Sequence, residues 1–129
     1  MLENKVTVLT LARGMAAHAA ARQGLIAQNV AHADTPGYRP RDLPSFAETF
    51  RGTGGLAMQR TRPGHLGVRE GPAALRPVAV PGATSPNGNG VSIEREMMRA
   101  AEVRQAHDLA LAIRSSLSGA IRTALGRGR

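Results

Sequence analysis

The side chains that most often do chemistry are sparse and scattered in this chain of 129 residues. Its four histidines are His18, His32, His65 and His107, and no two of them have the spacing of a pair of metal ligands. His107 is followed directly by Asp108, so on a helix the two side chains would point to different faces. The sequence contains no cysteine, no Gly-x-Ser-x-Gly and no phosphate-binding glycine loop. It therefore predicts no catalytic residue, no metal site, no cofactor and no small-molecule substrate.

The charge of the chain favours a second class of function. Seventeen basic against nine acidic residues give a formal net charge of +8, and Lys5 is the only lysine. A small helical module that binds nucleic acid is therefore an alternative hypothesis, which a steep salt dependence of DNA affinity would support. Against it, the arginines are scattered, with no basic run and no interleaved aromatic residues that would stack on bases. We expect no nucleic-acid partner.

The distribution of helix breakers divides the chain into three segments. All eight prolines and all three aromatic residues lie between Pro36 and Pro86. We expect a helix within residues 1–35, an irregular region rich in Gly, Pro and Arg at 36–90, and a helix within 91–129. The predicted fold class is all-α, with an antiparallel, coiled-coil-like pair of long terminal helices and short strands near Leu75–Val80 at most. Because many apolar residues are alanines, which gain little from burial, we expect assembly to complete the core.

The first segment has apolar residues at helical spacing from Leu2 to about Ala33. They form two rows, Leu2, Val6, Leu9, Ala16, Ala20, Ala27 and Val30 along one face and Val8, Leu11, Met15, Ala19 and Ile26 beside it. No segment approaches the roughly 20 apolar residues that cross a bilayer. Ala17-His18-Ala19 has the form of a signal-peptide cleavage site, but cleavage there would remove half of the helix. We therefore expect no cleaved signal peptide.

The last segment contains the clearest seam. Ser92 is the expected N-cap, Glu94 and Glu96 suit the positive end of the helix dipole, and Gly126 suits its end. A 3-4 spacing, typical of coiled coils, predicts an assembly seam, which comprises Val103, Ala106, Ala110, Ile113, Leu117, Ala120 and Ala124. Ile93, Met97 and Ala100 belong to a displaced stripe, so we expect the seam to change register near Ala101.

The most specific pattern lies where the first helix meets the loop. It reads Asn29-Val30-Ala31-His32-Ala33-Asp34-Thr35-Pro36-Gly37-Tyr38. This stretch resembles the signature of bacterial flagellar rod and hook proteins, in which Asn-Ile/Val-Ala-Asn closes the N-terminal helix and a Thr-x-Gly-Tyr/Phe turn follows. The entry to the second helix is similar to that family's Gly-Asn-x-Val-x-Leu-x-x-Glu-Met, through Asn87, Gly88, Asn89, Val91, Ile93, Glu96 and Met97.

Individual signature residues also have physical interpretations. We expect Asn29 and Asp34 to satisfy the last helix carbonyls and the turn amides, and Tyr38 to cover the exit of the chain. His32 stands where the family usually has asparagine, and one ring nitrogen of histidine can bond a backbone group in the same way.

The resemblance implies a non-enzymatic structural subunit of the proximal rod in the flagellar basal body, within the periplasmic space. Its implied partners are copies of itself, other rod proteins, the adaptor between the rod and the membrane ring, that ring, and the type III export apparatus. Phe46-x-x-x-Phe50 resembles the Phe-x-x-x-hydrophobic motif that the export gate recognises, and local packing is the alternative. A peptidoglycan-cleaving enzyme of the rod is a third hypothesis, but carboxylates such as Glu48 and Glu70 form no acid pair in a defined fold.

Overall fold

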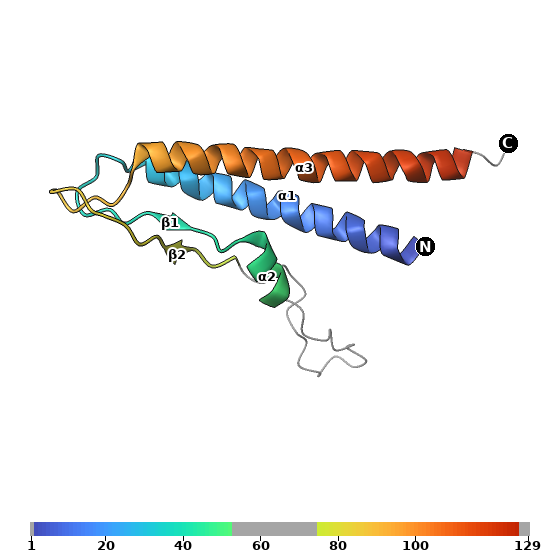
Figure 1. Ribbon diagram of the computed structural model, residues 1–129, viewed down its shortest axis with the longest axis horizontal. Coiled ribbons are helices and arrows are strands. Elements are labelled where there is room, and N and C mark those ends of the chain that lie inside the picture. The colour runs from blue at the N-terminus through green and yellow to red at the C-terminus, as the bar shows by residue number, and fades with distance from the viewer. Residues whose placement is uncertain (1, 53–74, 127–129) are drawn as a thin grey trace, which may run out of the picture.

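The protein is built on two long helices that run antiparallel. The computed structural model describes residues 2–52 and 75–126. In chain order its elements are α1 (Leu2–Ala31), β1 (Arg41–Asp42), α2 (Phe46–Gly52), β2 (Val78–Ala79) and α3 (Ile93–Gly126). Figure 1 shows α1 and α3 side by side, with both termini at the same end of the molecule. The predicted all-α class, with an antiparallel helix pair and very short strands, is confirmed. His65 and Glu70 lie outside the described residues.

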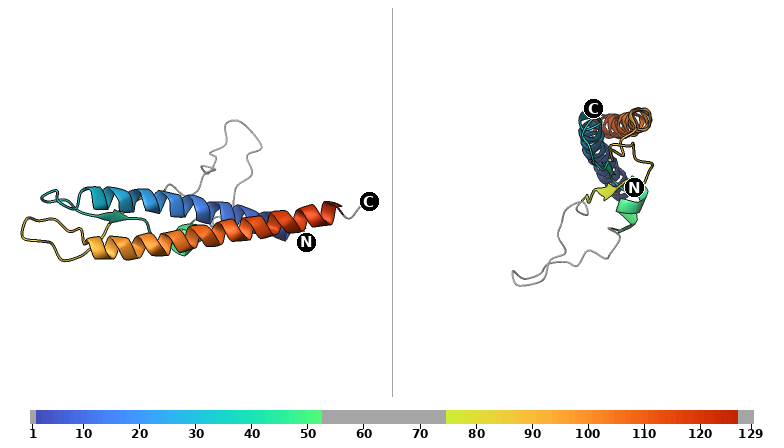
Figure 2. Two further views of the ribbon diagram at one scale, coloured as in Figure 1. Left: turned by 90° about the horizontal axis from the view of Figure 1, so that it is seen from above. Right: turned by 90° about the vertical axis from the view of Figure 1, so that its left-hand side faces the viewer.

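The two helices are not equally close along their length. They meet at the end that carries the connecting loops and lie farther apart toward the termini (Figure 1). Seen from above, they cross at a shallow angle (Figure 2). We call the first region the loop end and the second the open end. In the view of Figure 1 the strands and α2 lie below α1, and β1 packs mainly against α1 while its Asp42 also reaches Arg99 of α3.

The α1 face that packs on α3 mixes apolar and polar residues. Its buried or half-buried positions follow a 3-4 spacing, which comprises Ala12, Met15, Ala19, Arg22, Ile26 and Asn29. Ala19 and Ile26 form one small apolar cluster with Val103 of α3. In the other row, Ala20, Ala27 and Val30 are exposed, whereas Leu9 and Ala16 are half-buried, so the apolar pattern identified the core face only in part. It missed this face because Arg22 and Asn29 occupy two of its positions.

The facing surface of α3 keeps one register along its length. Its buried or half-buried positions are Glu96, Arg99, Val103, Ala106, Ala110, Ile113 and Leu117, whereas Ala120 and Ala124 are exposed. The expected change of register near Ala101 is therefore wrong, because Ile93 and Met97 are exposed and Glu96 is buried. The seam continues toward the start of α3 through Glu96 and Arg99. A search for apolar side chains does not detect these two positions.

The helix ends follow the local sequence. Ser92 caps α3 as expected, since its carbonyl accepts from Glu96 N at 3.0 Å and its Oγ from Arg95 N at 3.5 Å. Hydrogen bonds from its own amide and from Ser92 Oγ lower the pKa of Glu94. At the start of α2, Ser45 and Glu48 form a capping box: Ser45 N donates to Glu48 Oε2 at 3.0 Å and Glu48 N to Ser45 Oγ at 3.3 Å.

The strands form a single short antiparallel pair. Arg41 lies opposite Ala79 and Asp42 opposite Val78, and Val80 N donates to the Pro40 carbonyl at 3.0 Å. β2 falls within the segment where a strand was expected. The sequence did not reveal β1, since two residues between prolines offer no alternation to detect. In the described ranges, neither long helix has a stretch of the length and apolarity needed to span a bilayer.

Candidate functional site

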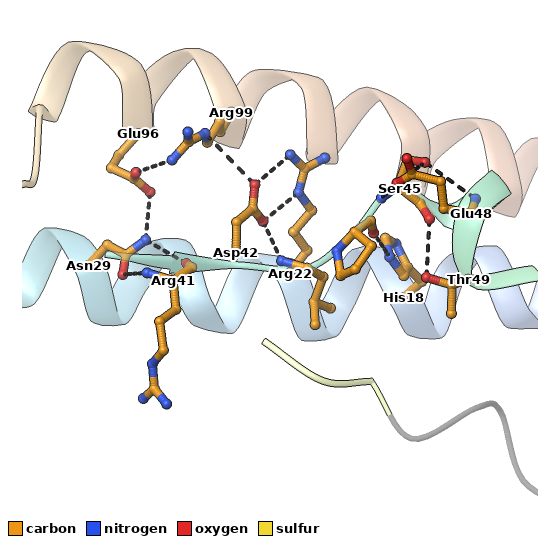
Figure 3. Close-up of polar contacts among 12 residues, drawn as sticks. His18, Arg22, Asn29, Arg41, Asp42, Ser45, Glu48, Thr49, Glu96 and Arg99 are labelled. Atoms are coloured by element: carbon orange, nitrogen blue, oxygen red, sulfur yellow. Dashed lines mark hydrogen bonds and ion pairs between the residues drawn. The ribbon is translucent and has the colours of Figure 1, made fainter. Parts of the chain in front are cut away.

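The loop end contains a buried group of polar side chains, which we call the polar hub. Its members are Arg22, Asn29, Asp42, Glu96 and Arg99. Figure 3 shows Glu96 of α3 reaching toward Asn29 of α1, and both Arg99 of α3 and Arg22 of α1 directed at Asp42. The polar hub therefore joins both long helices to the segment that follows α1.

Asn29 makes the central contacts of the polar hub. Its Nδ2 donates to the Arg41 carbonyl at 2.9 Å and to Glu96 Oε2 at 3.1 Å. Its Oδ1 accepts from Arg41 N at 3.1 Å and from the Tyr38 hydroxyl at 3.3 Å. The amide thus pairs with both backbone groups of Arg41, as a neighbouring strand would. Asn29 and Glu96 are each only 1% exposed, so these bonds replace the hydration that both side chains lose.

Asp42 binds the two arginines of the polar hub. Arg22 binds it in a bidentate manner: Nε donates to Oδ1 and Nη2 donates to Oδ2, each at 2.7 Å. Arg99 Nε lies 3.8 Å from Oδ2, and Leu43 N donates to Oδ1 at 2.8 Å. Burial raises the pKa of Asp42, but these hydrogen bonds and positive charges together outweigh burial and hold it below its ordinary value. The same hydrogen bond to Asp42 raises the pKa of Arg22.

The charges of the polar hub balance. Arg99 Nη1 donates to Glu96 Oε1 at 2.6 Å, so two carboxylates face two guanidinium groups. Burying ions without partners costs several kcal/mol each, and the chain avoids that cost by pairing them. Among the described residues, no buried side-chain nitrogen or oxygen lacks a hydrogen-bond partner. The polar groups of the hub are directed at one another, which suits a structural joint.

A second polar contact joins the turn after α1 to Asn89, which lies in the loop before α3. Asn89 is buried, and its Nδ2 lies 2.9, 2.8 and 2.7 Å from the carbonyls of His32, Ala33 and Thr35. Its Oδ1 accepts from Val91 N at 2.7 Å. Asn89 therefore bonds carbonyls of the turn just beyond α1, whereas the last carbonyls of α1 accept from backbone amides such as His32 N and Ala33 N. The expectation that Asn29 satisfies them is wrong. Asn29 is turned inward to Arg41 and Glu96.

The exit turn packs two aromatic rings and two glycines together. The His32 and Tyr38 rings stack with centroids 4.6 Å apart, and His32 Nδ1 donates to the Gln28 carbonyl at 2.8 Å. One ring nitrogen thus bonds a backbone group, as the sequence suggested. Gly37 has a φ of 73° and Gly88 of 80°, a region that favours glycine. A Cβ on Gly88 would lie 3.4 Å from the Gly37 Cα, so the two loops approach closely here.

The remaining signature residues lie around these contacts. Val30, Ala31, Asp34, Thr35, Pro36, Asn87, Ile93 and Met97 are exposed, and Val91 is half-buried. Asp34 thus stands at the surface, and the turn is held instead by backbone bonds such as Gly37 N to the Asn87 carbonyl at 3.1 Å. The exposed positions form a surface beside the hub.

The two phenylalanines lie together at the far side of α1. The Phe46 and Phe50 ring centroids are 5.9 Å apart, and Phe46 also meets the His18 ring edge to face at 5.7 Å. His18 is buried, and its Nε2 donates to the Pro44 carbonyl at 2.8 Å. Phe46 thus packs locally, whereas Phe50 is 54% exposed. Both phenylalanines belong to the short helix α2.

Comparison of the sequence with known proteins assigns the chain to a family. The chain is 34% identical over 106 residues to flagellar basal body rod protein FlgB of Salmonella typhimurium, an alignment that covers 75% of this chain and 77% of the relative. The chain belongs to the FlgB family of flagellar basal body rod proteins. The FlgB proteins of Agrobacterium fabrum, 30% identical over 81% of each chain, and of Escherichia coli, 31% identical over 80% of this chain and 79% of the relative, agree. No family model matches the chain.

Sequence reasoning found some of the residues that meet at the loop end and missed others. Asn29, Tyr38, Asn89 and Glu96 were all singled out as signature residues, and the structure brings them to the loop end. Arg22, Asp42 and Arg99 were not singled out as site residues. A signal existed for two of them, because Arg22 and Arg99 fall on the 3-4 spacing of their helices. Asp42 follows no periodic pattern.

Proposed function

We propose that this chain is a structural subunit of the proximal rod, which assembles with copies of itself and other rod proteins into the tubular drive shaft. The observation that carries the proposal is the contrast between satisfied polar groups and unburied apolar ones. In the described ranges the buried apolar residues are Ala12, Ala19, Ile26, Leu43, Val103 and Ala110. On α3, the leucines Leu109, Leu111 and Leu125 stay exposed. Such surfaces are typical of interfaces with other subunits.

The proposed mechanism is mechanical. Small side chains along the helix seams permit close approach of helices, and many repeated contacts around a tube resist torque better than a single contact. The terminal segments 1–35 and 91–129 form the packing part, and 36–90 is the region that adapts to individual neighbours. These neighbours are other rod proteins, the adaptor between the rod and the membrane ring, and the ring itself. The location is the rod within the periplasmic space, reached without a cleaved signal peptide.

We further propose that Phe46 and Phe50 serve as a signal for the type III export gate. The support is their shared position on α2 and the exposure of Phe50. In the folded chain Phe46 packs on His18, so this ring would serve the gate before folding and the packing of α2 on α1 afterwards. Replacing both by alanine should lower secretion into the medium several-fold while leaving cellular amounts unchanged. Undiminished secretion of the double variant would remove the gate role.

We propose no enzymatic activity and no nucleic-acid partner. Glu48, the described carboxylate of the third hypothesis, is held in the capping box with Ser45. The basic charge that suggested nucleic acid is partly used inside the protein, since Arg22 and Arg99 pair with Asp42 and Glu96.

The direct test is incorporation into the basal body. The gene for this chain is deleted from its host, and the strain is complemented with a tagged copy. The expected result is loss of swimming on deletion, recovery on complementation, and the tag in purified basal bodies. Swimming that survives the deletion, or a tag found outside basal bodies in a complemented strain, would contradict the proposal.

A further inference from the structure

Besides its seam with α1, α3 carries two more stripes with the same heptad-like spacing. The first, which we call the groove stripe, consists of Ala100, Arg104, His107 and Leu111. The second, which we call the ridge, consists of Met98, Glu102, Gln105 and Leu109. In both, the steps along the sequence are four, three and four residues. Positions two apart on a helix differ by about 160° around its axis, so the two stripes lie on nearly opposite sides of α3.

The groove stripe borders a groove between the two long helices. The groove has a volume of about 610 Å³, and α1 contributes Ala19, Ala20 and Gln23 to its wall. On α3 its wall includes Ala100, Arg104 and His107, so three positions of the groove stripe line it. Four of the eight residues that line it are alanines, Ala19, Ala20, Ala100 and Ala101, which leaves room for larger side chains from outside.

The ridge has the opposite character. Met98 is 67% exposed and Leu109 is 53% exposed, so two large apolar side chains stand out from the helix. Glu102 and Gln105 lie between them and are also exposed. Exposure of such an apolar ridge to water is unfavourable, so a partner that covers it lowers the free energy of the assembly.

The two stripes are complementary residue by residue. If a second α3 runs parallel to the first with an offset of two residues, or about 3 Å, four pairs form along the contact. The large Met98 faces the small Ala100, Glu102 faces Arg104, Gln105 faces His107, and Leu109 faces Leu111. This register provides one size match, one ion pair, one polar pair and one apolar pair, and all four use the spacing that the stripes share.

We propose that the ridge of one copy of this chain docks in the groove of a second copy, with their α3 helices parallel and offset by two residues. The proposal rests on the proposed rod function and adds to it which surfaces meet. Because ridge and groove lie on opposite sides of α3, a copy that receives a ridge offers its own ridge to the next. Such a contact does not close on itself as a symmetric dimer does. It generates an extended row of subunits, as the wall of a tube requires.

The test is disulfide cross-linking in basal bodies, for which the absence of native cysteine gives a clean background. Two in-register double variants are made, Met98→Cys with Ala100→Cys and Leu109→Cys with Leu111→Cys. Cysteines two apart on one helix point away from each other, so bonds within a copy are disfavoured. The matched control, Met98→Cys with Leu111→Cys, is out of register. Each variant is expressed in the deletion strain, and basal bodies are oxidised and separated without reducing agent.

Both in-register pairs are expected to give ladders that extend beyond the dimer, and the control about tenfold less product. Equal product from the control would overturn the register. Dimers from the Met98→Cys variant alone would overturn the heterologous contact, because they require two ridges to meet. Absence of cross-links from both in-register pairs in swimming cells would overturn the docking while the rod function stands. If the wild-type chain were not found in purified basal bodies, the rod function itself would be overturned instead.

Charge reversal provides a second measurement. Glu102→Arg and Arg104→Glu should each lower the in-register product about fivefold, and the two changes in one chain should restore most of it. Glu102 also contributes to the field at Arg22, so the unfolding of each variant is compared with wild type. Equal product from wild type and both single variants would contradict the ion pair between copies.

Discussion

The two ends of the helix pair are stabilised by different means. At the loop end, the polar hub and Asn89 satisfy buried polar groups with partners from the same chain. At the open end the helices separate without a comparable polar group among the described residues, and Leu125 is exposed, as Ile93, Met97 and Met98 are on the outer surface of α3 at the loop end. A chain with so few large buried apolar residues uses directional polar contacts where it must fold alone. It keeps its apolar surface where other subunits can cover it.

This difference explains why the same spacing serves two purposes. Along α3, the seam contains Glu96 and Arg99 near the loops and Ile113 and Leu117 farther on. A buried ion pair adds specificity of geometry more than net stability, which suits a joint that must set the angle between helices. Apolar positions gain free energy from any well-fitting neighbour. We therefore expect changes at the two ends to have separable effects.

The largest effect is expected from a charge at the open end. Leu117→Asp places a carboxylate on a half-buried seam, where the charged form is costly without a partner. We expect swimming to be abolished, as also for Ile113→Asp, because assembly is blocked. Amide exchange at the loop end of the isolated chain should stay as in wild type. Leu117→Met is the matched control and should swim. Normal swimming of the aspartate variants would contradict an assembly role for the seam.

Breaking the polar hub should mainly affect the isolated chain. Glu96→Ala removes the partner of Asn29 Nδ2 and of Arg99, and losing one side of a buried ion pair costs about 3 kcal/mol. The free energy of opening, from hydrogen exchange of hub amides, should fall by that amount. Glu94→Ala, an exposed neighbour at the same helix start, is the control and should lose much less. If the free energy of opening fell equally in the two variants, the polar hub would not stabilise the chain more than an exposed helix-end charge does.

A smaller loss is expected at the turn just beyond α1. Asn89→Ala leaves the carbonyls of His32, Ala33 and Thr35 without their side-chain donor, at a cost of about 2 kcal/mol. Amides of that turn should exchange correspondingly faster. Asn87→Ala removes a single bond to Asn89 N and should cost less than half as much. If Asn87→Ala proved the more damaging, backbone contacts of the loop would hold the turn instead.

The smallest effect is a pH dependence of the hub. The pKa of Asp42 is lower in the folded chain than in the unfolded chain. Its contribution to stability is therefore complete above the unfolded value of about 4 and is lost as pH falls through the folded value. Thermal unfolding between pH 2 and pH 6 should show this acid loss in wild type and much less of it in Asp42→Asn. Asp108→Asn, at an exposed aspartate, should retain the wild-type profile.

The sequence predicted the elements better than their contacts. Both long helices and the N-cap Ser92 followed from breakers, caps and spacing, because these are local properties. The core face of α1 was identified only in part, since Arg22 and Asn29 occupy apolar-type positions. Asn89 contacts the turn after α1 from the far side of the chain, and no local pattern contains that pairing. β1 exists only through its partner strand, so its two residues carry no signal of their own.

Hydrogen–deuterium exchange of the isolated chain, at low micromolar concentration, tests the central claim most directly. We expect amides of residues 19–29 and 96–106 to be protected, and those of residues 113–125 to exchange almost as fast as in an unfolded peptide. Incorporation into basal bodies should then protect the second group. Uniform, cooperative protection of both long helices in the monomer would contradict the account, since a single chain would have completed the fold without neighbours.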